Sequence, residues 1–309
     1  MKIFFATDLH ASEVCFRKFC AAAGFYGCDA LVMGGDVTGK LVVPIVVEDG
    51  HARYRLGGVT HRCGRQEVPV EERRIANMGY YAVVGGPEVE DELADPQRYE
   101  ARLLHEARRR LQGWAQYADG RLGPSGVPIL VAPGNDDDPS IDSVFEASTV
   151  FINGEAAIRD LLGVEVASSG WSNTTPWHTP RELSEPDLEC RLRTLASQLR
   201  DPEHAIFNFH VPPHGTPLDL CPELDEGLRM VTVMGAPVMA HAGSVAVRRL
   251  IEEFQPLLGL HGHIHEARGA VRLGRTLALN PGSEYSEGVL KGVIVSIDGG
   301  KVQHSFTAG

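Results

Sequence analysis

The chain has 309 residues, 43% of them hydrophobic, which is enough to bury a core as one large domain or two smaller ones. Its 41 acidic and 29 basic residues give a formal net charge of −12, a field that repels long nucleic acids and anionic membranes. A polyanionic partner would therefore need a local cation. The six cysteines form no C-x-x-C pair, so we expect reduced, mostly buried thiols rather than a zinc ribbon or a disulfide framework.

The first apolar run, at residues 3–7, is too short for a signal-peptide core or a membrane span, so we expect a cytoplasmic protein without a membrane partner. Similar short runs bounded by Gly, Pro or Asp recur along the chain and predict buried strands. A helical pattern at 96–117 starts with Asp95 as N-cap and Pro96 as first residue. Strands that alternate with helices indicate an α/β fold. The further runs cover residues 30–34, 128–132, 205–209 and 257–260.

Residues 41–56 differ, because two strand-like runs flank an Asp49-Gly50 turn, a strong hairpin signal. We interpret about 41–95 as an insertion into a single domain that spans residues 1–309, and its acidic end as a solvated face. After residue 265, short strands at 270–279 and 289–297 are expected to close a second sheet against the first.

Each of the five predicted strands is followed by potential metal ligands. Loops beyond the carboxyl ends of strands in α/β sheets line one crevice, so residues distant in sequence can converge there. Carboxylate, imidazole and amide groups without cysteine suit Mn²⁺, Fe²⁺ or Zn²⁺. Seven groups exceed the needs of one ion, whereas two ions that share a carboxylate would use them all. The predicted ligands are Asp8, His10, Asp36, Asn135, His210, His263 and His265.

Taken singly, most of these residues have an ordinary structural interpretation. Asp8 could cap a helix, the glycine-rich segment around Asp36 could be a turn, and His210 could be a buried core histidine. The pair His263 and His265 is harder to explain by packing, because residues two apart on an extended segment point the same way. With the other segments in place, the metal interpretation is favoured.

The ordered segments "DLH", "GDVTG", "GNDD", His210 and "GHIH" resemble the signature of the calcineurin-like metallophosphoesterase family, D-x-H, G-D-x-x-G, G-N-H-[D/E], a lone His and G-H-x-H. The resemblance implies two mixed β-sheets packed as a sandwich and flanked by helices, with two metals at one end. Asp8, His10, Asp36 and His265 would hold the first metal. Asp36, Asn135, His210 and His263 would hold the second, and a metal-bridging hydroxide would attack the phosphorus.

Asp136 departs from the signature, since the family usually has a histidine there, near the leaving group. An aspartate beside two cations should stay ionised and make a poor acid. His214, four residues after His210, could instead supply the proton or reach the substrate, although a surface imidazole is an equal alternative. The loop at 168–179, with two tryptophans, could form a pocket rim or a surface anchor, and His261 is expected to support the metal ligands.

Three functions remain open from the sequence. The first is a two-metal phosphodiesterase or phosphatase acting on a small phosphoester. The second is an inactive phosphoesterase fold that serves as a protein-interaction module. The third is a nuclease with the same chemistry, which the net charge and the presence of only five lysines disfavour. The complete set of seven ligands favours the hydrolase.

Overall fold

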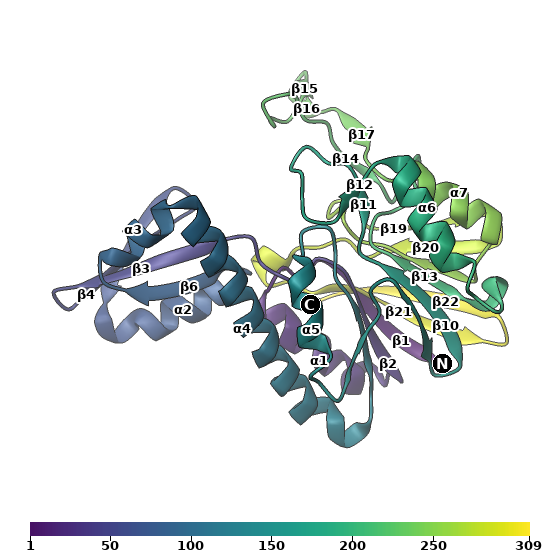
Figure 1. Ribbon diagram of the computed structural model, residues 1–309, viewed down its shortest axis with the longest axis horizontal. Coiled ribbons are helices and arrows are strands. Elements are labelled where there is room, and N and C mark those ends of the chain that lie inside the picture. The colour runs from purple at the N-terminus through teal and green to yellow at the C-terminus, as the bar shows by residue number, and fades with distance from the viewer.

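Two six-stranded mixed sheets face each other at the centre of the molecule, in a computed structural model that describes residues 1–309 (Figure 1). This confirms the predicted α/β sandwich. The first sheet has the order β22 (Lys301–Ala308), β21 (Lys291–Asp298), β1 (Lys2–Ala6), β2 (Ala30–Gly34), β7 (Ile129–Ala132) and β8 (Phe151–Asn153). The second has the order β19 (Gly269–Leu273), β20 (Thr276–Asn280), β18 (Leu258–Leu260), β13 (Ile206–Phe209), β10 (Val164–Ser169) and β9 (Ala157–Leu161).

The inner strands of both sheets run parallel, and only strands toward the edges are antiparallel. In the first sheet β1, β2, β7 and β8 pair in parallel, while β21 and β22 are antiparallel. In the second sheet β10, β13, β18 and β20 pair in parallel. Side chains such as Phe5 and Val32 of the first sheet pack between the sheets against Ile206 and Leu258 of the second. Each such buried side chain contributes roughly 1.5–3 kcal/mol.

Helices cover the outer face of each sheet. On the first sheet lie α1 (Glu13–Tyr26), α4 (Pro96–Leu122) and the single turn α5 (Asp142–Phe145), where the ring of Phe16 stacks on Trp114 at 4.0 Å between centroids. On the second sheet lie α6 (Glu185–Ala196) and α7 (Val245–Phe254). The Asp95 side chain accepts a hydrogen bond from Arg98 N and so caps α4, as its sequence predicts.

Residues 42–94 form a lobe that projects from the sandwich (Figure 1). Its sheet has the order β5 (Val59–Gly64), β4 (His51–Leu56), β3 (Val42–Glu48) and β6 (Tyr81–Gly85), and its helices are α2 (Val68–Asn77) and α3 (Glu88–Ala94). Asp49 and Gly50 both have positive φ, as the predicted hairpin turn requires. Helix α4 joins the lobe to the sandwich, because Ala107 packs against the lobe while Leu111 packs on the first sheet.

The end of the chain is divided between the two sheets. Residues 270–279 are not one strand but the hairpin of β19 and β20, which turns at Gly274 with φ of 62°. These two strands extend the second sheet, whereas β21 and β22 extend the first. The segment 270–279 therefore closes the second sheet as expected, whereas the segment 289–297 extends the first sheet instead.

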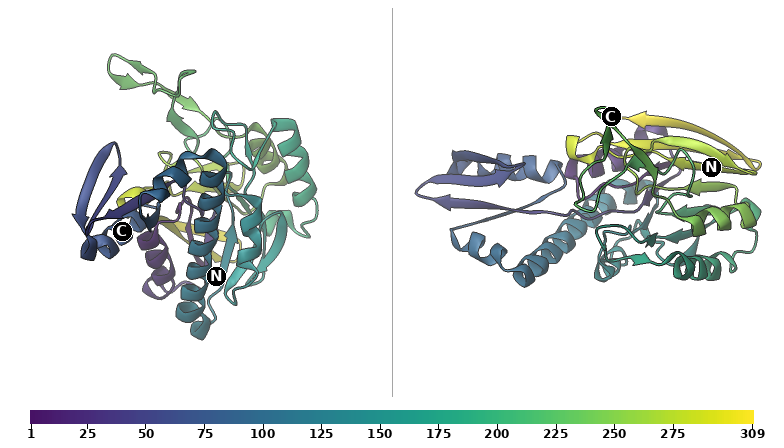
Figure 2. Two further views of the ribbon diagram at one scale, coloured as in Figure 1. Left: turned by 60° about the vertical axis from the view of Figure 1, so that its left-hand side comes forward. Right: turned by 90° about the horizontal axis from the view of Figure 1, so that it is seen from above.

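Shorter elements lie in the connections on the side of the second sheet. Figure 2 shows an arm that projects from the body, built from two small ribbons, β14 (Leu220–Pro222) with β17 (Met239–His241) and β15 (Thr232–Val233) with β16 (Ala236–Pro237). A further pair is β11 (Ser172–Asn173) with β12 (Glu182–Leu183). Short 3₁₀ turns lie at Arg65–Glu67, Gly123–Ser125, Pro139–Ile141, Pro202–His204 and Tyr285–Glu287.

The six cysteines are all free thiols. Cys15, Cys20 and Cys28 are buried, but Cys63 and Cys221 are half-buried and Cys190 is exposed, so the expectation of mostly buried thiols holds for only half of them. Burial raises the pKa of the Cys20 thiol to about 12. None of the helices combines the length and the apolar character needed to cross a bilayer.

Candidate metal centre

The five motifs meet at one end of the sandwich because each follows a strand whose carboxyl end points there. The loops after β1 and β2 are joined by main-chain hydrogen bonds, with His10 N donating to Asp36 O at 2.9 Å. The loops after β13 and β18 are joined in the same way, with Gly262 N donating to His210 O at 2.8 Å. The crevice expected at the carboxyl ends of parallel strands is therefore where the structure brings these residues together.

Four of the predicted ligands form a first group, in which one ligand atom from each residue lies within 4.8 Å of the others. His10 Nε2 lies 3.2 Å from His265 Nε2 and 3.6 Å from Asp36 Oδ2. His265 Nε2 lies 3.4 Å from Asp8 Oδ1. This group is Asp8, His10, Asp36 and His265, the set that the resemblance assigns to the first metal.

A second group consists of Asp36, His210 and His263. His210 Nε2 lies 3.4 Å from Asp36 Oδ1, and Asn135 Oδ1 lies 2.8 Å from His263 Nδ1. Asn135 therefore borders this group, as the second predicted ligand set requires. Asp36 belongs to both groups, so its carboxylate is placed where a shared ligand would be.

Main-chain carbonyls fix the orientation of two of the imidazoles. His10 Nδ1 lies 3.2 Å from Thr38 O, and His210 Nδ1 lies 3.0 Å from Gly34 O. With Nδ1 engaged, each ring directs Nε2 toward the carboxylates. His210 Nε2 is buried and forms no hydrogen bond, although Asp36 Oδ1 lies 3.4 Å away. A cation at this position would satisfy it.

Backbone strain is concentrated in these loops. Asp8, His10, Asp36 and His263 all have positive φ, between 41° and 66°, a region that non-glycine residues rarely adopt. Such conformations cost of order 1–3 kcal/mol each and persist where the surroundings enforce them. The neighbouring Gly262 leaves room for this packing, since a Cβ there would overlap the Asp8 carboxylate.

The carboxylates dominate the electrostatics of the ion-free centre. Burial raises the pKa of Asp8, but His265 and His210 outweigh it and bring the pKa to about 2. Burial lowers the pKa of His10 to about 3, against the opposing charge of Asp36. Burial also lowers the pKa of His210, yet Asp36 and Asp8 raise it to about 10. In the ion-free protein the two carboxylates thus favour a proton on His210, and a metal cation would compete with that proton for the imidazole nitrogen.

The three consecutive aspartates at 136–138 have three different roles. Asp137 is fully buried, and its carboxylate accepts hydrogen bonds from the main-chain nitrogens of Val37, Thr38 and Gly134 at 2.8–2.9 Å. It therefore locks the loop of Asn135 against the loop of Asp36. Asp138 caps the next turn by accepting from Ser140 N at 2.8 Å.

Asp136 faces the metal centre and forms an ion pair with Lys40. Its main-chain N–H donates to Asp36 Oδ1 at 3.0 Å. Burial and the charge of Asp36 raise the pKa of Asp136 to about 7 in the ion-free protein, although Lys40 opposes them. The expectation of an ionised Asp136 refers to the metal-loaded centre, where two further cations would favour the charged form.

His214 lies in a different cluster. Its Nδ1 is 3.6 Å from Asp219 Oδ2, and His241 Nδ1 is 2.8 Å from Asp219 Oδ1. Asp219 is fully buried and also accepts hydrogen bonds from Gly215 N and Thr216 N. His214 is thus held at the base of the arm, and no contact joins it to a predicted metal ligand.

Two other regions predicted from the sequence, His261 and the loop at 168–179, lie next to predicted ligands. His261 is fully buried with Nδ1 2.8 Å from Phe209 O, on the strand that leads to His210. In the loop at 168–179, Thr179 Oγ1 accepts a hydrogen bond from Asn135 Nδ2 at 2.9 Å, while Trp177 is 60% exposed. The loop therefore reaches a ligand through a threonine rather than a tryptophan.

Lys40 and Tyr285 are residues of the centre that sequence analysis missed. The ring of Tyr285 lies 4.5 Å from that of His10. Lys40 directly follows the "GDVTG" segment, and this proximity to a motif was the available signal. For Tyr285 the sequence offers only its place in the loop after β20, which follows the last motif.

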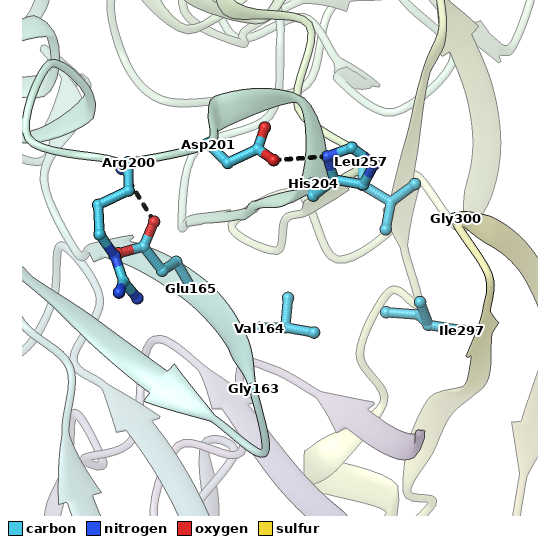
Figure 3. A pocket seen from close by; sticks show the side chains of 9 residues that line it. All are labelled: Gly163, Val164, Glu165, Arg200, Asp201, His204, Leu257, Ile297 and Gly300. Carbon is cyan, nitrogen blue, oxygen red and sulfur yellow. Dashed lines mark hydrogen bonds and ion pairs between the residues drawn. The ribbon is translucent and has the colours of Figure 1, made fainter.

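A surface pocket of about 400 Å³ is lined by residues that include Val164, Arg200 and Leu257 (Figure 3). Leu257, which borders it, precedes β18, whereas the metal motifs follow their strands. Its charged side chains are paired with each other, Arg200 Nε with Glu165 Oε1 and His204 Nδ1 with Asp201 Oδ2, both at 2.8 Å. Nothing in this pocket converges on a ligand, so the metal centre remains the candidate site.

Comparison with known proteins supports the fold assignment. No family model matches the chain. The uncharacterized protein MJ1162 of Methanocaldococcus jannaschii is 27% identical over 157 residues, which cover 50% of this chain and only 64% of that relative. One solved structure has a TM-score of 0.59 at 18% identity and covers 98% of both chains. TT1561 of Thermus thermophilus has a TM-score of 0.54 at 16% identity over 98% of this chain and 97% of that one.

These two structures share the fold of this chain over nearly its whole length. The order of the five motifs, the two-sheet sandwich and the ligand groups that share Asp36 all agree with the resemblance drawn from the sequence. The fold and the placement of the motifs therefore agree with the resemblance to the calcineurin-like metallophosphoesterases.

Proposed function

We propose that the protein is a hydrolase that cleaves phosphoester bonds of a small substrate with the help of two divalent metal ions. The observation that carries this proposal is the pair of ligand groups that share the Asp36 carboxylate. A structural role does not call for seven polar groups on five separate loops to converge, four of them in strained backbone conformations.

The residues present fit a pair of metals of the Mn²⁺, Fe²⁺ or Zn²⁺ type. The donors are imidazole, carboxylate and amide groups, and the buried Nε2 of His210 has no partner of its own. When bound, two such cations would polarise a phosphoryl oxygen and lower the pKa of a water molecule. We assign Asp8, His10, Asp36 and His265 to one ion, and Asp36, Asn135, His210 and His263 to the other.

The chain's own contribution is a preorganised set of donors. The carbonyls of Thr38 and Gly34 hold two imidazoles in place, and Asp137 fastens the loop of Asn135 to that of Asp36. Ligand loops that follow a strand directly and are fastened by hydrogen bonds move less than free loops. The centre therefore needs little rearrangement to accept ions and a phosphoester.

A small phosphoester is the proposed substrate class, rather than a long nucleic acid. The net charge of −12 disfavours a polyanion. The interaction-module alternative is placed behind the hydrolase, because a module has no need of an intact ligand set.

Metal analysis of the purified protein, combined with a substrate panel, tests this function. We expect about two metal equivalents per chain after reconstitution with Mn²⁺, and metal-dependent hydrolysis of p-nitrophenyl phosphate or bis(p-nitrophenyl) phosphate. Asp298→Asn, an exposed substitution at the end of β21, serves as the control that keeps both properties. A chain that binds no metal and hydrolyses neither ester would instead support the interaction module.

A further inference from the structure

Lys40 is anchored at the edge of the metal centre by its own loop. The preceding residue, Gly39, donates its main-chain N–H to the hydroxyl of the buried Tyr81 at 2.8 Å. A Cβ on Gly39 would overlap Gly79 O, so the main chain is closely packed at this point. The Lys40 side chain is about half exposed, at 51%, and extends from this fixed base toward Asp136.

Asp136 connects the lysine to the shared ligand. The Asp136 side chain is only 11% exposed, and its carboxylate pairs with the Lys40 ammonium. Its main-chain N–H donates to Asp36 Oδ1 at 3.0 Å. Asp136 therefore links the Lys40 ammonium, through its carboxylate, to the Asp36 carboxylate, through its main-chain N–H.

Lys40 is the only lysine or arginine that pairs with Asp8, Asp36 or Asp136. The remaining lysines are engaged elsewhere or lie on the far strands. Lys2 and Lys18 donate to main-chain carbonyls, and Lys291 pairs with Glu284. In a protein with a net charge of −12, this ammonium is a side-chain cation that can attract an anionic substrate in addition to the two proposed metal ions.

We infer that the Lys40 ammonium, held in place by Asp136, binds the phosphoryl oxygens of the substrate at the metal centre. This inference rests on the proposed function. An ionised Asp136 alone would repel a phosphoester, whereas the ion pair is neutral overall and the ammonium keeps N–H donors that Asp136 does not use. The ammonium contributes charge and hydrogen bonds from beside Asp136, the position where the resemblance expects a histidine.

An ordinary surface ion pair is the competing explanation, and such pairs contribute little to stability. The two explanations differ in a measurable way. A surface pair can be removed without any change in phosphate binding. A phosphate-binding ammonium cannot, because a charge-assisted hydrogen bond to the ligand would be lost.

The test measures the affinity of inorganic phosphate by calorimetry on the metal-loaded protein, together with metal content. We expect Lys40→Ala to weaken phosphate binding by about 10- to 100-fold, the usual worth of a hydrogen bond to a charged group, with unchanged metal content. Lys40→Arg should retain most of the affinity, since it keeps the charge. Lys301→Ala, an exposed lysine on β22, is the matched control with wild-type affinity.

A double variant sharpens the test. Combining Lys40→Ala with Asp136→Asn should recover part of the lost affinity, because it removes the unpaired carboxylate charge that would otherwise repel the phosphate. Steady-state kinetics on p-nitrophenyl esters should show KM rising more than kcat falls in Lys40→Ala.

Two results would overturn the inference. Unchanged phosphate affinity in Lys40→Ala would leave Lys40 as a surface ion pair while the proposed function stands. Loss of metal in the same variant would show that Lys40 supports the ligands instead of the substrate. A wild-type protein that neither binds phosphate nor hydrolyses the esters would overturn the proposed function as well, which separates the two failures.

Discussion

The main-chain N–H of His263 donates to the carboxylate of Asp8, 3.1 Å from Oδ2 and 3.2 Å from Oδ1, across 255 residues of sequence. This hydrogen bond joins the loop after β1 of the first sheet to the loop after β18 of the second sheet. Both residues have positive φ, so each loop is held in a conformation that it would not adopt alone. The two halves of the candidate centre are thus assembled by the packing of the sheets, and the centre should be lost when that packing is lost.

The first prediction concerns Asp36, whose carboxylate belongs to both ligand groups. Asp36→Asn keeps the shape of the side chain but removes the charge, so we expect both metal equivalents to bind more weakly and hydrolysis to fall by at least about 100-fold. Inductively coupled plasma mass spectrometry after dialysis, paired with activity assays, measures both effects. Retention of two tightly bound metals with full activity would remove the basis for a shared ligand.

The second prediction concerns Arg181, which is 1% exposed beneath the loop of Asn135. Its Nε donates to Asp137 O at 2.8 Å, and its Nη2 pairs with Asp142 Oδ1 at 2.6 Å. Arg181→Met would leave buried polar partners uncompensated, so we expect the free energy of unfolding to fall by about 3–5 kcal/mol.

Urea denaturation of the Arg181 variant measures this loss. Arg53→Met is the control, because Arg53 pairs with Glu90 and both side chains are 43% exposed, and exposed pairs contribute about 0–1 kcal/mol. Equal unfolding free energies for the two variants would contradict the assignment of Arg181 as a buried anchor.

Much of the fold is predictable because the local signals and the tertiary structure agree. The apolar run at 30–34 is β2, the Asp49-Gly50 turn joins β3 to β4, and Asp95 caps α4. The strand β5, "VTHRCG", escapes prediction because it has no apolar alternation. The sequence predicts one strand where the structure has the hairpin at 269–280, because Gly274 is a weak turn signal by itself.

The candidate centre is predictable only as far as motifs identify residues. Three adjacent aspartates are indistinguishable in the sequence, yet the structure buries Asp137, exposes Asp138 and pairs Asp136 with a lysine from the loop after β2. Only tertiary contacts assign these roles. The role of His214 and a cytoplasmic location stay predictions, since no contact or comparison tests them.

The third prediction concerns stability and pH through Asp119, near the end of α4. Its carboxylate accepts hydrogen bonds from Ser148 Oγ, Thr149 N and Val150 N at 2.7–3.1 Å. Burial raises the pKa of Asp119, but these hydrogen bonds outweigh burial and hold the pKa below its ordinary value of 3.8. The carboxylate therefore stabilises the folded state fully above that value, and the contribution is lost as the pH falls through the lowered folded pKa.

Asp119→Asn should accordingly lower the free energy of unfolding by about 1–2 kcal/mol at pH 7, and the difference from wild type should shrink below about pH 4. Chemical denaturation at several pH values between acidic and neutral measures it. Asp298→Asn, at an exposed position without a side-chain hydrogen bond, should show no such difference. If the difference in the free energy of unfolding between Asp119→Asn and wild type grew toward low pH, the pH dependence assigned to Asp119 would be wrong.

The fourth prediction concerns substrate size. The net charge of −12 should exclude long single-stranded DNA or RNA in favour of small phosphodiesters or activated monoesters. Assays with a fluorescent oligonucleotide and bis(p-nitrophenyl) phosphate at about 50 and 200 mM salt compare the two classes. Efficient oligonucleotide cleavage that declines steeply with salt would indicate a surface groove of basic side chains that binds the strand. It would favour the nuclease over the hydrolase of small phosphoesters.

The last prediction concerns Asp136 and the departing alkoxide. A histidine at this position can give a proton to the leaving group, a contribution of typically about 10²–10⁴-fold, whereas an aspartate beside two bound cations should stay ionised. His214 Nδ1 lies 3.6 Å from Asp219 Oδ2 in a separate cluster, and its predicted part in proton transfer calls for a variant of its own. Rates across substituted phenyl esters should therefore depend strongly on the pKa of the leaving group.

Asp136→His should make the rates depend less on the pKa of the leaving group, because an imidazole that reaches the ester oxygen helps poor leaving groups more than good ones. The comparison requires chemistry to be rate-limiting, which single-turnover measurements establish. His214→Gln serves as a parallel variant, and it should leave the slope unchanged if His214 plays no part in proton transfer. A wild type without leaving-group dependence, together with an Asp136→Asn variant as slow as a ligand variant, would instead identify Asp136 as the acid.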